Sequence, residues 1–313
     1  MSPGKRKTCP PARERPSLIN RPSKVDVRDF GSPFSPGEPF YRFIDTLPNI
    51  LAAQDLKKLV MAIKTAAAKK KPIIMGMGAH VIKVGLSSII IDLMERDLIT
   101  ALAFNGAGII HDFEVAFCGR TSEDVASQLA VGTFGMAHET AEFLNQAIAY
   151  AAEEQKGLGE AVGEKIAVSA FPYKHLSLLA AAYRLRKAAT VHVAIGTDVI
   201  HMHPEARGEA IGQTSLRDFF IFCQQVEKLN GGGVYLNVGS AVILPEVFLK
   251  AISYVRSSGH KLDGFTTAVF DFIRHYRPSQ NVIKRVVGKK GQGFYFVGHH
   301  EIMLPLLAAC LKA

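Results

Sequence analysis

The chain has 313 residues, 48% of them hydrophobic, which allows one large α/β domain or two ordinary ones around a sizeable core. It contains no run of 18 uncharged apolar residues, no signal-peptide core and no close pair among its four cysteines, so we expect a cytoplasmic protein without a membrane span, a disulfide framework or a cysteine zinc site. The net charge of +9 is concentrated in residues 1–24, where seven basic residues face one glutamate, and we therefore do not expect nucleic acid among the partners.

Residues 1–35 are basic and rich in proline, which is typical of a flexible tail, and residues 36–313 contain no linker or repeat and are expected to form a single domain. Helical spacing of apolar residues predicts a helix over 43–63, and the lysine run 69–71 suits its carboxyl end. Beyond residue 71, short apolar runs alternate with longer amphipathic stretches. The short runs predict strands over 72–78, 99–105, 190–195, 232–238, 262–271 and 293–298.

Strands that alternate with helices of ten or more residues are typical of βαβ units. The sequence therefore predicts the α/β class: a Rossmann-like, doubly wound, mostly parallel sheet with helices on both faces. A helical stretch after residue 120 is expected to be an insertion.

Ligands of an open parallel sheet bind beyond the carboxyl ends of the strands. The turns expected there are 75–80, 104–112, 196–203, 237–241, 266–271 and 298–301, and four of them place glycine beside a hydroxyl, amide or titratable side chain. Glycine allows close backbone approach, and the following helix N-terminus favours phosphate, so the set predicts a nucleotide ligand. The alternative is that these glycines only permit tight turns, since no G-x-G-x-x-G fingerprint is present.

Histidines form the second candidate group. His111, Asp112, His201 and His203 could act as acid–base groups or assemble a metal site, although nothing in the sequence fixes their distances and we predict no metal. His299 and His300 open the last predicted helix. The alternative is that these histidines only form structural hydrogen bonds or face solvent.

The segment GLSSIIIDLMERDLITALAFNGAG (85–108) resembles the first nucleotide-binding segment of the deoxyhypusine synthases, in which an apolar strand ends in Thr-Thr-Ala-Gly-Gly. Further matches follow in the same order along the chain, so that the resemblance covers about residues 73–310. They lie at 196–198, 215–222, 231–234, 265–268 and 305–309.

This resemblance implies NAD as cofactor, a homo-oligomer (tetramer or dimer), and NAD-dependent transfer of an aminobutyl group from a polyamine or similar amine to a lysine of a protein substrate. Asp218 falls in the place of an acid that holds the polyamine. The NAD contacts, carried over by position, are Asn105, Gly106, Ala107, Gly108, Asp198, Thr267 and Ala268.

The sequence also departs from the family. The family's paired glutamates fall on Ile110 and His111, and its lysine-bearing stretch is missing. The place of that lysine falls on Val286, with Lys284 two residues away, and in a strand this offset would keep the same face. Three interpretations stay open: a deoxyhypusine synthase-like enzyme using Lys284, His111 and Asp218, a relative with histidine–aspartate or metal chemistry in the nucleotide pocket, and a non-catalytic NAD-binding protein.

Overall fold

The computed structural model describes residues 17–313, so residues 1–16, with Cys9 and nearly half of the predicted tail, lie outside the described part. The strands are β1 (Ile73–Met77), β2 (Ala101–Asn105), β3 (Ala188–His192), β4 (Val234–Val238), β5 (Thr266–Asp271) and β6 (Gln292–Val297). The α-helices are α1 (Phe40–Thr46), α2 (Leu51–Ala68), α3 (His80–Lys83), α4 (Ser87–Glu95), α5 (Gly106–Cys118), α6 (Val125–Ala130), α7 (His138–Glu153), α8 (Leu158–Val168), α9 (Leu178–Arg184), α10 (Gly208–Glu227), α11 (Ile243–Ser257), α12 (Tyr276–Pro278) and α13 (His300–Lys312). Short helical segments are η1 (Val27–Asp29), η2 (Lys174–Leu176), η3 (Val199–Met202) and η4 (Ser279–Lys284).

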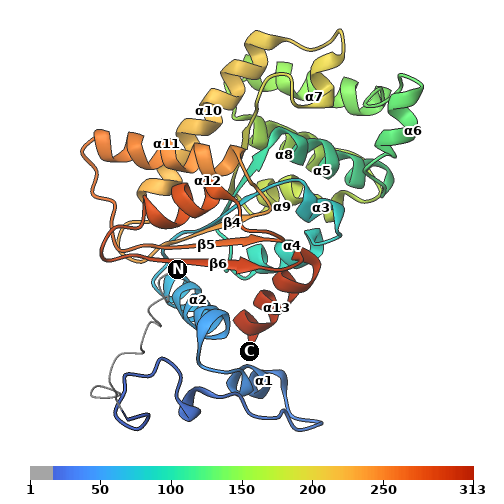
Figure 1. Ribbon diagram of the computed structural model, residues 1–313. Coiled ribbons are helices and arrows are strands. Elements are labelled where there is room, and N and C mark those ends of the chain that lie inside the picture. Colours follow the sequence, from blue (N-terminus) through green and yellow to red (C-terminus); the bar gives the residue numbers. More distant parts are fainter. Residues whose placement is uncertain (1–16) are drawn as a thin grey trace, which may run out of the picture.

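All six strands run parallel in the order β3-β2-β1-β4-β5-β6, which confirms the predicted Rossmann-like, doubly wound sheet. The order reverses between β1 and β4, and α4 and α11, which follow these two strands in the chain, pack on opposite faces of the sheet. In Figure 1 the β5 and β6 arrows point to the end of the sheet at which α13 begins.

Helices cover both faces of the sheet, and successive residues of each strand face opposite cores. In β1, Ile73, Met75 and Met77 belong to the core beneath α2, α4 and α13, whereas Ile74 faces α10, α11 and η4. Figure 1 shows α11 and α12 above strands β4–β6, with α2 and α13 below them. Burial on both faces explains why the strand sequences are almost continuously apolar.

Helices α6–α9 lie between α5 and β3, where the sequence predicts a helical insertion. The strand predicted over 190–195 is displaced, since β3 spans 188–192. Residues 196–203 therefore follow a loop rather than the strand itself. Among residues 17–313, no helix is long and apolar enough to span a bilayer.

Cys223 and Cys310 are free and buried, whereas Cys118, at the end of α5, is exposed. Residues 17–35, the described part of the predicted tail, are almost wholly exposed. Phe34 nevertheless packs edge-on against Phe43 of α1, with ring centroids 5.8 Å apart, so the chain contacts the first helix just before the predicted boundary at residue 36.

Candidate functional site

The turns after β1 and β4 meet at the reversal of strand order, which is the usual ligand position in this fold. Here a β-carbon on Gly78 would lie 2.2 Å from the carbonyl oxygen of Gly239. The two backbones therefore touch, and only glycine fits at residue 78. The rings of His80 and His300 lie nearby, with centroids 5.4 Å apart. A cavity at the same edge of the sheet instead lies beside β2.

This cavity, of about 190 Å³, lies beyond the carboxyl end of β2, next to the first turn of α5. Its wall combines α5, the end of α3, and loops around residues 122–125, 134 and 197–199. The structure thus brings together Ala107 and Asp198, which the resemblance implies as NAD contacts, and His111, which belongs to the candidate histidines. The titratable residues of the wall are Lys83, His111, Glu114, Glu123 and Asp198.

The carboxylate of Asp198 lies against the N-terminus of α5. A β-carbon on Gly106 would be 1.8 Å from Oδ2 of Asp198, so residue 106 has to be glycine for the carboxylate to lie there. Asp198 is only 7% exposed, and its Oδ2 has no hydrogen-bond partner within residues 17–313. Burial raises the pKa of Asp198 to about 6. A buried acceptor without a donor is costly, and it fits a ligand that brings a hydroxyl or an N–H group.

Asn105 and Gly108 shape the start of the helix. The side chain of Asn105 caps α5 by accepting a hydrogen bond from the backbone N–H of Gly108 at 3.2 Å. A β-carbon on Gly108 would lie 2.8 Å from the ring of Phe104, so glycine lets the helix pack closely on the end of β2. Both residues position the first turn of α5, which carries Ala107 into the cavity wall.

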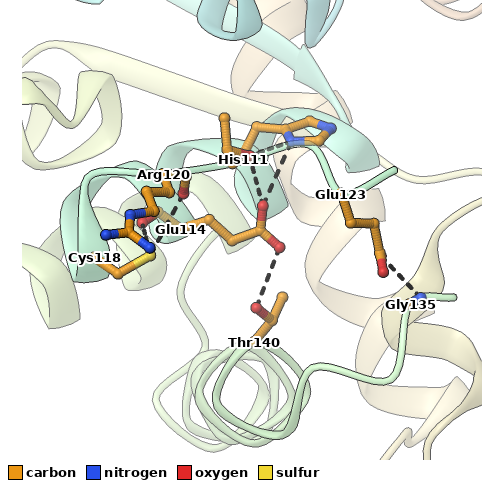
Figure 2. A network of polar contacts seen from close by, with 8 residues as sticks. His111, Glu114, Cys118, Arg120, Glu123, Gly135 and Thr140 are labelled. Atoms are coloured by element: carbon orange, nitrogen blue, oxygen red, sulfur yellow. Dashed lines mark hydrogen bonds and ion pairs between the residues drawn. The ribbon is translucent and has the colours of Figure 1, made fainter. Parts of the chain in front are cut away.

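His111 and Glu114, one helical turn apart on α5, share a network of polar contacts (Figure 2). The Thr121 hydroxyl donates to Glu114 Oε2 at 2.5 Å, and His111 Nδ1 lies 2.6 Å from the same hydroxyl oxygen. Because Thr121 donates its proton to Glu114, Nδ1 of His111 is the donor in that contact, and Nε2 is the ring nitrogen left for other partners. In Figure 2 the second ring nitrogen points away from the network.

Glu114 is held in its ionised form. Burial acts to raise its pKa, but the contacts with His111 and with the hydroxyls of Thr121 and Thr140 outweigh burial and lower it. Glu123 ties two loops together, because its Oε1 accepts a hydrogen bond from the backbone N–H of Gly135 at 2.9 Å. Neither glutamate was predicted as a site residue, although the i, i+3 spacing of His111 and Glu114 on a helix indicates that their side chains can interact.

Asp112 and Asp218 lie outside the cavity wall and bind backbone groups. Asp112 accepts hydrogen bonds from Ser177 Oγ at 2.6 Å and from the first N–H groups of α9, at Leu178 and Leu179. Asp218 Oδ2 accepts from the N–H groups of Gly159 in α8 and Val191 in β3. Burial raises the pKa of Asp112 to about 6 and that of Asp218 to about 8. Asp112 thus joins α5 to α9, and Asp218 joins α10 to α8 and to β3.

Thr267, Ala268 and Lys284 do not line the cavity either. Thr267 and Ala268 are buried within β5, before its end at Asp271, and the Thr267 hydroxyl donates to the carbonyl of Val282 at 2.7 Å. Lys284 is the last residue of η4, a π-helical segment, and it is exposed. The strand expected around Lys284 is therefore wrong, because η4 continues directly from α12, and the same-face argument does not apply.

His201 and His203 brace loops. His201 Nδ1 accepts a hydrogen bond from the backbone N–H of Gly196 at 3.1 Å, and His203 Nε2 lies 2.8 Å from the carbonyl oxygen of Gly135. Within residues 17–313 no three histidine, cysteine or acidic side chains are arranged to hold a metal ion. The metal arrangement considered from the sequence is therefore not formed by these residues.

No protein-family model and no curated protein matches the sequence, but the fold is similar to that of solved structures. A candidate deoxyhypusine synthase from Entamoeba histolytica superposes with a TM-score of 0.53 at 11% identity, over 90% of this chain and 95% of that one. AgrE in a ternary complex with ornithine and NAD+ gives 0.52 at 12% identity, over 83% of this chain and 33% of AgrE.

ArgZ, an arginine dihydrolase from the ornithine–ammonia cycle in cyanobacteria, gives a TM-score of 0.51 at 14% identity, over 84% of this chain and 33% of ArgZ. This chain thus spans about a third of the length of AgrE and ArgZ. At these identities the comparisons establish the fold. The chain is a Rossmann-like α/β protein whose structural neighbours include a candidate deoxyhypusine synthase and an NAD-bound protein.

Proposed function

We propose that this chain is an NAD-dependent enzyme that acts on a small amine at the cavity beside α5. The observation that carries the proposal is the buried Oδ2 of Asp198, which has no partner within the described residues and lies at the start of the helix that follows β2. Rossmann-like proteins use an acidic side chain at the sheet edge to accept hydrogen bonds from ribose hydroxyls. Asp198 supplies such an acceptor.

The cavity size limits how NAD would bind. Pockets that enclose whole ligands hold roughly 300–1,000 Å³, whereas this cavity holds about 190 Å³. It would therefore enclose one end of the dinucleotide, and the rest would extend along the surface. A homo-oligomer, as the resemblance implies, would cover that exposed part.

The proposal of an amine substrate rests on the negative charge of the cavity wall. Glu114 and Glu123 place two carboxylates on the wall, and the lowered pKa of Glu114 keeps it ionised at neutral pH. A carboxylate favours an ammonium group within about 4–6 Å. NAD supplies oxidation of the carbon that bears the amine, by accepting a hydride from it. His111, with Nε2 free to accept a proton, would deprotonate the ammonium group beforehand.

Aminobutyl transfer to a protein lysine is the more specific form of this proposal. It needs a lysine nucleophile that is uncharged and close to the oxidised carbon. The family's lysine falls in the place of Val286, and Lys284, two residues away, is the candidate for this role; a shift of η4 or a neighbouring subunit would have to bring it to the cavity. Lys83, at the end of α3, already lies in the cavity wall.

A second candidate function is NAD-dependent chemistry at the same cavity without a lysine adduct. The observation in its favour is that His111 lines the cavity while Lys284 is exposed on η4. In this version the oxidised amine is hydrolysed or cyclised, and His111 handles the protons. The two versions predict different effects of lysine substitutions.

Thermal unfolding of the full chain, titrated with NAD in the presence and absence of spermidine or ornithine, tests the proposal. A ligand that binds only the folded state raises the melting temperature with the logarithm of its concentration. We expect a rise with NAD and a further rise with one of the amines. An unchanged melting temperature with NAD, at concentrations up to millimolar, would reject the proposal.

A further inference from the structure

Lysines gather at the amino ends of the strands, which is the opposite end of the sheet from the cavity. A hollow of about 790 Å³ lies between the C-terminus of α2, the C-terminus of α10 and the start of β2. A second hollow, of about 540 Å³, lies between α2 and the start of β6. The first is lined by Lys69, Lys70, Lys71 and Lys228, and the second by Lys57, Lys58 and Lys290.

These seven lysines, here called the amino-end lysines, carry uncompensated charge. Within residues 17–313 none of them lies within 4 Å of a carboxylate oxygen, although Lys156, Lys187, Lys250 and Lys312 all do. The one carboxylate on the described walls of the two hollows, Asp97, is bound to Lys187. The walls of the two hollows therefore carry seven lysines against one carboxylate, and this end of the sheet favours anions.

Backbone contacts hold part of this surface in place. Nζ of Lys71 donates to the carbonyl oxygen of Asn230 at 2.8 Å, and Nζ of Lys57 donates to that of Leu47 at 2.7 Å. Both partners are neutral, so the lysines keep their charge and further N–H donors. The ammonium groups of Lys57 and Lys71 are thus held in place by the backbone, whereas a free lysine side chain would be mobile.

The charged surface is wide. The hollows reach from Thr100, just before β2, to Gln292, the first residue of β6. Four inter-strand steps of roughly 4.8 Å separate β2 from β6 in the sheet, which makes about 19 Å. A single small anion would contact only part of this width. A polyanion with regularly spaced charges would contact all of it.

The other lining residues indicate which polyanion fits. No aromatic side chain is present on the described walls of either hollow, so the surface offers nothing on which unpaired bases could stack. Thr65, Gln225 and Gln292 add hydroxyl and amide donors of the kind that bind phosphate oxygens. Met61 is the one large exposed hydrophobic side chain on these walls, which is too little for insertion into a membrane.

We infer that the amino-end lysines bind the phosphate backbone of duplex nucleic acid, without reading its sequence. This inference revises the expectation drawn from composition, because the lysines come from separate segments that only the fold brings together. It does not depend on the proposed activity, since the surface and the cavity lie at opposite ends of the strands.

Fluorescence polarisation of the full chain with a labelled duplex of about 20 base pairs, between about 50 and 200 mM salt, tests the inference. The variant Lys69→Gln/Lys70→Gln/Lys228→Gln removes three charges from the first hollow. The control Lys250→Gln/Arg274→Gln/Arg277→Gln removes three charges from α11, the turn after β5 and α12. Matched melting temperatures confirm that both variants fold.

The slope of log K against log salt is negative, and each lost phosphate contact reduces its magnitude by about 0.9. We expect the first variant to reduce the magnitude of the slope by about 3 and the control to leave it unchanged. Equal losses in the two variants, or none in either, would overturn the inference and assign binding to the N-terminal segment or to net charge. Tighter binding to polyglutamate or to anionic vesicles than to the duplex would overturn it too.

Discussion

Oδ2 of Asp198 occupies the space that a β-carbon on residue 106 would need, at only 1.8 Å from it. This contact couples the loop after β3 to the first turn of α5, across the cavity that we assign to the nucleotide. Glycine at residue 106 and the acid at residue 198 are thus one structural unit. From this contact we predict that a substitution at either residue affects the other and changes NAD binding at the same site.

Gly106→Ala should push Asp198 away from α5. We expect a loss of about 1–3 kcal/mol in the free energy of unfolding, as for other overpacked sites, together with weaker NAD binding. Chemical denaturation monitored by circular dichroism measures the first effect. In an Asp198→Gly background, the same alanine should cost much less, because the clash is gone.

Gly212→Ala is the matched control, since a β-carbon at this position of α10 would meet nothing within 4 Å. Alanine there should leave stability unchanged or raise it by up to about 1 kcal/mol. Equal losses at residues 106 and 212 would show that the Asp198 contact is not the cause.

Asp218→Asn should change how stability depends on pH. Burial raises the pKa of Asp218 to about 8 in the folded chain, above its value in the unfolded chain. The proton held by the folded chain therefore stabilises it fully below about pH 4, and this contribution is lost as pH rises towards 8. Asparagine cannot ionise and keeps an acceptor for Gly159 and Val191, so the variant should gain up to about 1 kcal/mol per pH unit over wild type between pH 5 and 8.

Urea unfolding at several pH values measures the difference in free energy of unfolding between Asp218→Asn and wild type. Asp218→Ala is the control variant. Alanine leaves two buried N–H groups without their acceptor and should destabilise the chain at every pH. If the difference in free energy of unfolding between the asparagine variant and wild type is the same at every pH from 5 to 8, Asp218 is ionised over that whole range and the prediction is wrong.

The fold could be predicted from the sequence because its signal is local. Apolar runs as short as that of β1 are buried on both faces, and amphipathic helices separate them, so the parallel sheet follows from the pattern. The predicted secondary structure was wrong at the ends of some elements. The strand predicted over 190–195 begins two residues earlier, and the segment that carries Lys284 continues α12 as a π-helical turn.

The site was less predictable because it is formed by distant segments. The family resemblance indicated Ala107 and Asp198, the histidine pattern indicated His111, and the fold brings the three together. It could not show that Asp112 is used to cap α9, since nothing near Asp112 in the sequence marks residue 177 as its partner. Side-chain direction in three dimensions decides between a structural carboxylate and a functional one.

Asp112→Ala should destabilise the chain by about 2–4 kcal/mol, because it removes a buried cap from α9 and leaves Ser177 and two N–H groups without an acceptor. Asp124→Ala removes a comparable cap from α6, but an exposed one, and should cost about 1 kcal/mol or less. Thermal unfolding of the two variants compares them. A larger loss of stability in Asp124→Ala than in Asp112→Ala would contradict the role assigned to Asp112.

Substitutions of Lys83 and Lys284 distinguish the proposed reaction with a lysine adduct from the one without it. If a lysine adduct forms in the cavity, Lys83→Arg should abolish formation of the transfer product, while NADH formation from NAD and the amine persists. If Lys284 is the nucleophile, Lys284→Arg should have that effect instead. If neither change matters and His111→Ala abolishes NADH formation, the lysine-free version holds. Absorbance at the NADH band and mass spectrometry of the product measure both steps.

The most direct test of the central claim is calorimetric titration of NAD into the wild-type chain and into Asp198→Asn, with melting temperatures of both as the check on folding. The account predicts that wild type binds NAD and that the variant binds roughly 10-fold to 100-fold more weakly, since one hydrogen bond to a charged acceptor contributes about 1.5–3 kcal/mol. Absence of binding to wild type, or equal affinity in the two proteins, would contradict it.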